Sequence, residues 1–287
     1  PLTFSGVIQD SASAATLAAV LTMRERSLAW AGNAQGLSGS KVLRIYVSSE
    51  SHSSIDKAIW ISGIGAENIV RLPASGPMRS SDAEALRSAI KNDLELGFIP
   101  AGFIGVTGAT GMGACDNLES LIDVAQSFDL FVHVDAAWAG SAMICEEFRI
   151  LWRGIEKADS IVFNPHKWLG AQFDLSAHFI KNPSDLIKTL AIQPDYLKTH
   201  GSDEIVNYSE WSIPLGRRFR ALKLWFLFRC YGLEELRNRI RNHVNWSKEL
   251  CAQIGKTVNF EVTSEPILSL FTFRYAPENA RDLDAVN

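Results

Sequence analysis

Short apolar runs alternate with amphipathic segments along the first two thirds of the chain. The apolar runs predict strands at residues 41–47, 69–72, 103–107, 130–134, 158–163 and 176–180. Segments of helical period beside capping residues or glycine predict helices over residues 10–24, 55–62, 81–96 and 117–127. Strands that alternate with helices in this order indicate an α/β domain with a mostly parallel sheet.

The pattern changes after Leu190. Residues 191–216 are polar and show little periodicity, and so long a loop in a compact domain is usually functional or mobile. Beyond it we expect helices at 217–231 and 233–255 and strands at 259–262 and 267–273. We therefore expect a large domain over residues 1–222 and the start of a smaller α+β domain over residues 223–287.

Composition narrows the class of protein. The 287 residues are 47% hydrophobic and 21% charged, as in ordinary globular proteins, and the net charge of -4 gives no reason to expect nucleic acid as a partner. No apolar run approaches the roughly 18 residues that cross a membrane. The four cysteines lack metal-site spacing, and no signal-peptide pattern is present. We expect free buried thiols, no metal and a cytoplasmic location.

Candidate reactive side chains follow directly after predicted strands. His52, Thr110, Asp135 and Lys167 each occupy such a position. Ligands of open α/β sheets bind beyond the carboxyl ends of the strands. The sequence therefore predicts that these four side chains converge at one edge of the sheet.

Lys167 lies just past a buried strand, which Asn164 and Pro165 end, between a histidine and a tryptophan. We expect a partly dehydrated site there, where the amine becomes a usable nucleophile. Taken alone, the stretch is more typical of a solvated loop lysine, because most lysines are solvated.

Asp135 ends another buried run, and Ala136 and Ala137 leave room for a flat ring beside it. A carboxylate in such a place needs a cation, and a pyridinium is one, although a helix cap or a structural ion pair is an alternative. The helix start at residues 10–13 offers free backbone N–H groups to an anion, or it is simply a capped surface helix. A nucleophilic lysine, a buried carboxylate and an anion site are what pyridoxal 5'-phosphate (PLP) requires.

Three stretches, residues 133–140, 164–169 and 213–220, together carry a family resemblance. The chain resembles the group II PLP-dependent decarboxylases, and most of all the aromatic-L-amino-acid decarboxylases. That resemblance implies a fold type I, aspartate-aminotransferase-like architecture and a homodimer with active sites at the subunit interface. It implies decarboxylation of an aromatic L-amino acid, similar to tryptophan, DOPA, tyrosine or phenylalanine, to an amine and carbon dioxide.

The resemblance also implies roles for individual residues. Lys167 matches the Schiff-base lysine, Asp135 the partner of the pyridinium, Ala137 the small residue under the ring, and His52 the histidine that stacks on the ring and assists catalysis. Thr110 matches a threonine near the cofactor. The positions that match the phosphate cup are Ala12, Ser13, Asn164 and His166.

Tyr196 matches the tyrosine of the family's mobile catalytic loop, which returns a proton after carbon dioxide leaves. Because relatives with phenylalanine there tend to make aldehydes, Tyr196 favours simple decarboxylation. Trp138 stands where a tyrosine is common, and Gly216 suggests a roomy pocket for indole or catechol substrates. The family has a further N-terminal segment, so we expect the chain to be part of a longer one. The alternatives are an aldehyde synthase on the same scaffold and a non-catalytic truncated homologue.

Overall fold

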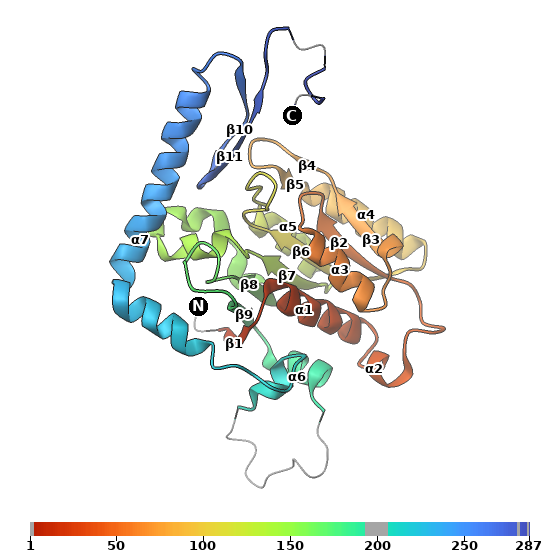
Figure 1. Cartoon of the computed structure of the whole chain (residues 1–287). Helices are drawn as coiled ribbons and strands as arrows, with labels where there is room; N and C mark the ends of the chain where they lie inside the picture. Colours follow the sequence, from red (N-terminus) through yellow and green to blue (C-terminus); the bar gives the residue numbers. More distant parts are fainter. Residues whose placement is uncertain (1–2, 193–205, 280–281, 286) are drawn as a thin grey trace.

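A computed structural model describes residues 3–192, 206–279, 282–285 and 287. Its centre is a seven-stranded sheet in the order β1-β9-β8-β7-β6-β2-β3 (Figure 1). The strands are β1 (Ser5–Gln9), β2 (Leu43–Ser48), β3 (Ile69–Leu72), β6 (Ile99–Val106), β7 (Phe131–Asp135), β8 (Ser160–Phe163) and β9 (Ser176–Ile180). The pairs from β3 to β8 are parallel, and β9 runs antiparallel to both β8 and β1. The predicted α/β fold with a mostly parallel sheet is confirmed.

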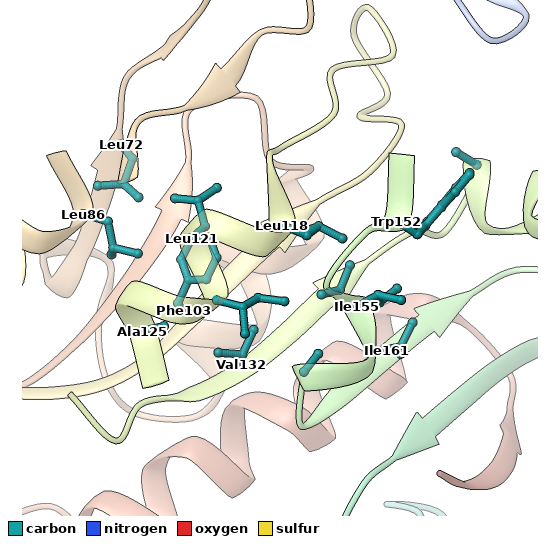
Figure 2. Close-up of a cluster of buried hydrophobic side chains, with 14 of the residues drawn as sticks. Leu72, Leu86, Phe103, Leu118, Leu121, Ala125, Val132, Trp152, Ile155 and Ile161 are labelled. Carbon is teal, nitrogen blue, oxygen red and sulfur yellow. The ribbon is translucent and has the colours of Figure 1, made fainter. Parts of the chain in front are cut away.

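Helices cover both faces of the sheet. On one face α1 (Ala12–Ser27) packs against α3 (Ser53–Ile61) and α6 (Pro183–Leu190), and the short α2 (Gly32–Gln35) follows α1. On the other face α4 (Ala83–Glu95) packs beside α5 (Leu118–Ser127). Figure 2 shows the core of this second face, where Phe103 and Val132 of the sheet lie beside Leu121 of α5. Burial of apolar strands on both faces explains why they read as continuous apolar runs.

Helix α7 (Ala221–Ile254) runs along one side of the domain and bends midway (Figure 1). Gly232 has φ 73° and ψ 164°, which interrupts the helix between the two helices that we predicted. The expected start at Arg217 is wrong by four residues, because the guanidinium of Arg217 turns back to the Ser212 hydroxyl and the Ile8 carbonyl. The expected domain boundary at residues 222 and 223 falls in the first turn of α7. Beyond it, β10 (Phe260–Ile267) and β11 (Leu270–Tyr275) form an antiparallel hairpin that packs on α7.

Several elements were not expected from the sequence. Strands β1, β4 (Ala74–Ser75) and β5 (Ser80–Ser81) and helix α6 are among them. So are the 3-10 helices of the described residues: η1 (Ala66–Asn68), η2 (Ala139–Ile144), η3 (Glu146–Trp152), η4 (Ile155–Lys157) and η7 (Tyr208–Trp211). Helix α6 has the usual start signals, since Asn182 accepts the N–H of Ser184 and Pro183 occupies the first turn.

The cysteines are free thiols, as predicted, but they are not all buried. Cys115, Cys145 and Cys251 are buried, whereas Cys230 is exposed on α7. Among the described residues, no helix is long and apolar enough to cross a membrane. The same part of the chain contains no group of three metal-binding side chains.

Candidate active site

A cavity of about 350 Å³ opens where strands β6, β7 and β8 end. This volume lies within the usual range of small-molecule sites. Nine of the ten predicted site residues line it: Ala12, Ser13, His52, Thr110, Asp135, Ala137, Asn164, His166 and Lys167. The tenth, Tyr196, lies outside the described residues. The structure thus brings these nine residues together at one edge of the sheet, beyond the carboxyl ends of the strands. Their individual roles stay predictions.

Asp135 is the last residue of β7, and its side chain is buried at the floor of this edge. The residue is 9% exposed, and its Oδ1 accepts the backbone N–H of Ala137 at 2.9 Å. Loss of water raises the pKa of Asp135, although the Ala137 N–H and the charges of Lys167 and His52 oppose that rise. Asp135 forms no ion pair with any residue that the structure describes. A cation bound in the cavity would therefore find a carboxylate that lacks a partner.

Lys167 sits in a turn that follows β8. Its N–H donates to the Asn164 carbonyl at 2.9 Å, and its own carbonyl accepts the N–H of Gly170 at 3.1 Å. The turn buries Trp168 and leaves the lysine exposed. The expectation of a partly dehydrated lysine is therefore wrong for the chain as described. The amine nevertheless lies at the cavity, and its charge acts on Asp135.

The start of α1 could bind an anion. Ser11 caps the helix by accepting the N–H of Ala14 at 3.2 Å, and Ala12 and Ser13 follow in the first turn. The N–H groups of a first turn have no acceptor within their helix, and they point along the positive end of the helix dipole. Since both residues line the cavity and have small side chains, a phosphate group can approach them closely.

Asn164 and His166 add polar groups to the wall of the same cavity. The Oδ1 of Asn164 is buried and has no hydrogen-bond partner among the described residues. His166 accepts the N–H of Leu175 at its Nδ1 (2.9 Å), which leaves the Nε2–H as its donor. Burial lowers the pKa of His166 and keeps the ring neutral. A ligand with acceptor oxygens would satisfy this donor, and a polar ligand would satisfy the orphaned amide.

His52 and Thr110 lie across the cavity. His52 caps α3: its Nδ1 accepts the N–H of Ser54 at 3.1 Å, which again leaves Nε2–H free to donate. Thr110 is an exposed residue of the turn that begins at Gly108. Gly108 has φ 79°, and a Cβ there would lie 2.3 Å from the Cβ of Ala139. Only glycine therefore lets this turn close against the wall of the cavity.

Two aromatic residues of the cavity were not predicted as site residues. Trp138 lines it and stacks on Trp168, with ring centroids 4.8 Å apart and planes 13° apart. The signal was available, since each indole follows the end of one of two adjacent strands. Phe173 lines the cavity as well, is 73% exposed and contacts the ring of His166. A single aromatic residue on a loop gives no periodic signal in the sequence.

Comparison with known proteins connects this geometry to a family. The pyridoxal-dependent decarboxylase conserved domain matches residues 2–276. Aromatic-L-amino-acid decarboxylase of Sus scrofa is 42% identical over 276 residues, which are 94% of this chain and 56% of that protein. Phenylacetaldehyde synthase of Arabidopsis thaliana is 39% identical over 295 residues, covering 98% of this chain and 59% of that protein. The chain thus spans less than two thirds of the length of these relatives.

Solved structures of similar fold support the same family. Oryza sativa TDC, solved with PLP and tryptamine, has a TM-score of 0.90 at 34% identity over 95% of this chain and 56% of its own. Tryptophan decarboxylase of Catharanthus roseus, solved in complex with L-tryptophan, has a TM-score of 0.88 at 32% identity over 99% of this chain and 58% of its own. The expected fold type I α/β architecture is confirmed. By its domain match, its identities and its fold, the chain belongs to the pyridoxal-dependent decarboxylase family.

Proposed function

We propose that this chain is the cofactor-binding part of a PLP-dependent enzyme that decarboxylates an aromatic L-amino acid. The observation that carries the proposal is the shared cavity of Asp135 and Lys167, which follow adjacent parallel strands beside the start of α1. The carboxylate, the amine and the anion site are three different requirements of one cofactor. Their convergence supports PLP more strongly than any one of them does.

When bound, PLP supplies an electron sink for the bond that breaks at the substrate Cα. Asp135 would keep a proton on the pyridine nitrogen. In the chain alone, burial raises the pKa of Asp135, and the charges of Lys167 and His52 offset that rise only in part. A pyridinium would reverse that imbalance, since an opposite charge stabilises the ionised carboxylate. We therefore assign Asp135 to the ring nitrogen.

The other residues bind and orient. We assign covalent attachment of the cofactor to the Nζ of Lys167, and phosphate binding to the first turn of α1 together with the Nε2–H of His166. Ala137 is small enough to lie under a flat ring, and the His52 imidazole would cover the opposite face. We assign the return of a proton at the substrate Cα to Tyr196, which the resemblance supports.

An aromatic substrate fits the walls of the cavity. Trp138 and Phe173 supply flat apolar surfaces there, and aromatic rings pack well against one another. The complexes of the relatives with L-tryptophan and tryptamine support the same class of substrate. Gly216 is exposed and does not line this cavity, so a roomy site for indole or catechol rests on the resemblance alone.

We further propose a cytoplasmic homodimer. Lys167 and Phe173 are exposed although both line the cavity, so a second copy could cover it from outside. Sedimentation of the purified protein would give the mass of the particle. A monomer at micromolar concentration with full activity would contradict the dimer.

One assay tests the function. The protein would be incubated with PLP and a panel of aromatic and acidic amino acids, and carbon dioxide and amine would be measured. Lys167→Ala should remove the cofactor that borohydride fixes to the wild-type protein. Lys91→Ala, an exposed lysine of α4, is the matched control and should change nothing. Fixation that persists in Lys167→Ala would show that another lysine holds the cofactor.

The second candidate function is that of an aldehyde synthase, because phenylacetaldehyde synthase is among the relatives. Tyr196 favours decarboxylation, and the same assay separates the two activities. Hydrogen peroxide and ammonia beside an aldehyde would establish the synthase. A wild-type protein that neither retains PLP nor releases carbon dioxide would favour a non-catalytic homologue.

A further inference from the structure

The loop that carries Lys167 is tied to the second segment of α7. Trp168 is 8% exposed, and its Nε1–H donates to the Nδ1 of His243 at 3.0 Å. An indole N–H can only donate, so the Nδ1 of His243 must be the unprotonated nitrogen. His243 is half-buried on α7. This contact joins residues 75 positions apart in the chain.

The same indole is one half of a stacked pair. Trp168 lies face to face with Trp138, which lines the candidate active site, whereas Trp168 and His243 line a second cavity between α7 and β11. The pair therefore forms a partition between two cavities. The turn at Gly108 also confines Trp138, since an added Cβ there would lie 2.9 Å from the indole Cε3. Because this turn and the stacked Trp168 both restrict Trp138, its plane follows the plane of Trp168.

Helix α7 holds the loop at two more points. Arg239 donates to the carbonyl of Trp168 at 3.4 Å and to that of Leu169. Leu236 packs with Leu169 in a buried cluster. The backbone of the loop is thus held by α7 without His243, so the histidine acts on the orientation of the indole.

We propose that His243 is a positioning residue for the aromatic wall of the active site. By accepting the indole N–H of Trp168, it sets the plane of the stacked Trp138 and so the fit of an aromatic amino acid against that wall. Without the acceptor, a buried N–H is left unsatisfied, and the indole shifts toward another acceptor and carries its stacking partner with it. The inference rests on the proposed function, because it concerns the substrate of that site.

The test compares wild type with His243→Phe, which keeps a flat ring without an acceptor, and with His243→Gln, whose amide oxygen can accept. Two further variants complete a double-mutant cycle. Trp168→Phe keeps a ring for stacking and removes the N–H, and His243→Phe/Trp168→Phe combines both changes. Steady-state KM and kcat for L-tryptophan are measured with PLP. Near-ultraviolet circular dichroism reports the stacked indoles before any ligand is added.

His243→Phe should raise KM about tenfold and change kcat less than about twofold, which is the size expected from one hydrogen bond that acts on binding. His243→Gln should keep KM within about threefold of wild type. In the Trp168→Phe background, adding His243→Phe should change KM less than about twofold. The dichroism of the stack should fall in His243→Phe and recover in His243→Gln.

An unchanged dichroism or KM in His243→Phe would overturn the inference, and so would a loss confined to kcat or additive effects in the cycle. If His243→Phe does not fold, Trp168→Phe and His243→Gln decide by the same criteria. If the wild-type protein shows no turnover, the result would refute the proposed function instead. The role of the wall would then be judged from calorimetric binding of L-tryptophan to the same proteins.

Discussion

Acid should destabilise the protein through two buried histidines on the α1 side of the sheet. His133 of β7 bonds Thr16 of α1 at 3.3 Å and Ser160 at 2.8 Å, and the same serine hydroxyl bonds His178 of β9 at 2.8 Å. His178 is 1% exposed, and its burial lowers its pKa to about 4. Burial also holds the pKa of His133 well below its usual value. Both rings are neutral in the fold.

The sign and the size of this loss of stability follow from proton linkage. An unfolded histidine binds a proton with a pKa near 6.5, so between about pH 6.5 and 4 the unfolded chain holds a proton that folded His178 does not. Stability therefore falls as the pH falls through this window. From pH 7 to pH 5 the loss from His178 alone is about 2 kcal/mol. Below about pH 4 the folded ring also takes up a proton, and the loss levels off near 3 kcal/mol.

The substitution His178→Leu isolates this effect. Leucine fills the buried site without titrating, and Ser160 keeps its bond to His133. Urea unfolding would be measured at pH 7, 6 and 5 for both proteins, with equal m-values as the control for an unchanged fold. The charge of His178 also lowers the pKa of His133, but at pH 5 folded His178 is still largely neutral, so the remaining groups titrate nearly alike in the two proteins. Wild type should therefore lose about 2 kcal/mol more than His178→Leu between pH 7 and 5. Equal losses would refute the burial of a neutral His178.

Substitutions at three further positions test the candidate site and the structure around it. Asp135→Asn should stabilise the protein without cofactor at pH 7, because burial raises the pKa of the carboxyl and so destabilises its ionised form; urea unfolding measures this change. The same substitution should weaken PLP binding, which a PLP titration measures. Gly108→Ala should cost about 2 kcal/mol or more, since φ is 79° and the new Cβ meets Ala139; an unchanged melting temperature would contradict the strain. Asp116→Ala should cost about 2–4 kcal/mol, because two buried backbone N–H groups lose their acceptor, whereas Asp116→Asn should retain part of that stability in the same thermal assay.

Strands buried on both faces could be predicted from the sequence with few errors. All five residues of β7 are buried, and the strand reads as an apolar run that only His133 interrupts before Asp135. Strand β1 could not be found in this way, because only Val7 and Gln9 of its five residues are buried and its partner β9 lies far along the chain. The start of α7 depends on where Arg217 turns back, which is a tertiary contact.

The residues of the candidate site also fall into those that local structure fixes and those that tertiary contacts fix. Residues fixed by the end of a strand or the start of a helix, such as Asp135 and Ser13, could be placed from the sequence because local structure decides their position. The exposure of Lys167 could not, because it depends on how the turn after β8 orients its side chains. The contact between Trp168 and His243 depends on the docking of α7, and no local pattern encodes it.

The pairing of β1 with β9 has a consequence for biosynthesis. Gln9 pairs with Ser176, so the ribosome must release most of the large domain before the first strand gains its neighbour. Helix α1 follows that strand directly, its first turn lines the cavity, and it packs on α3 and β6 as well as on β7, β8 and β9. Contacts so distant in the chain form slowly, and until they do the part of α1 that faces β8 and β9 stays open to solvent. The nascent chain therefore completes the candidate cavity late in translation, and a chaperone that shields α1 should raise the yield of folded protein.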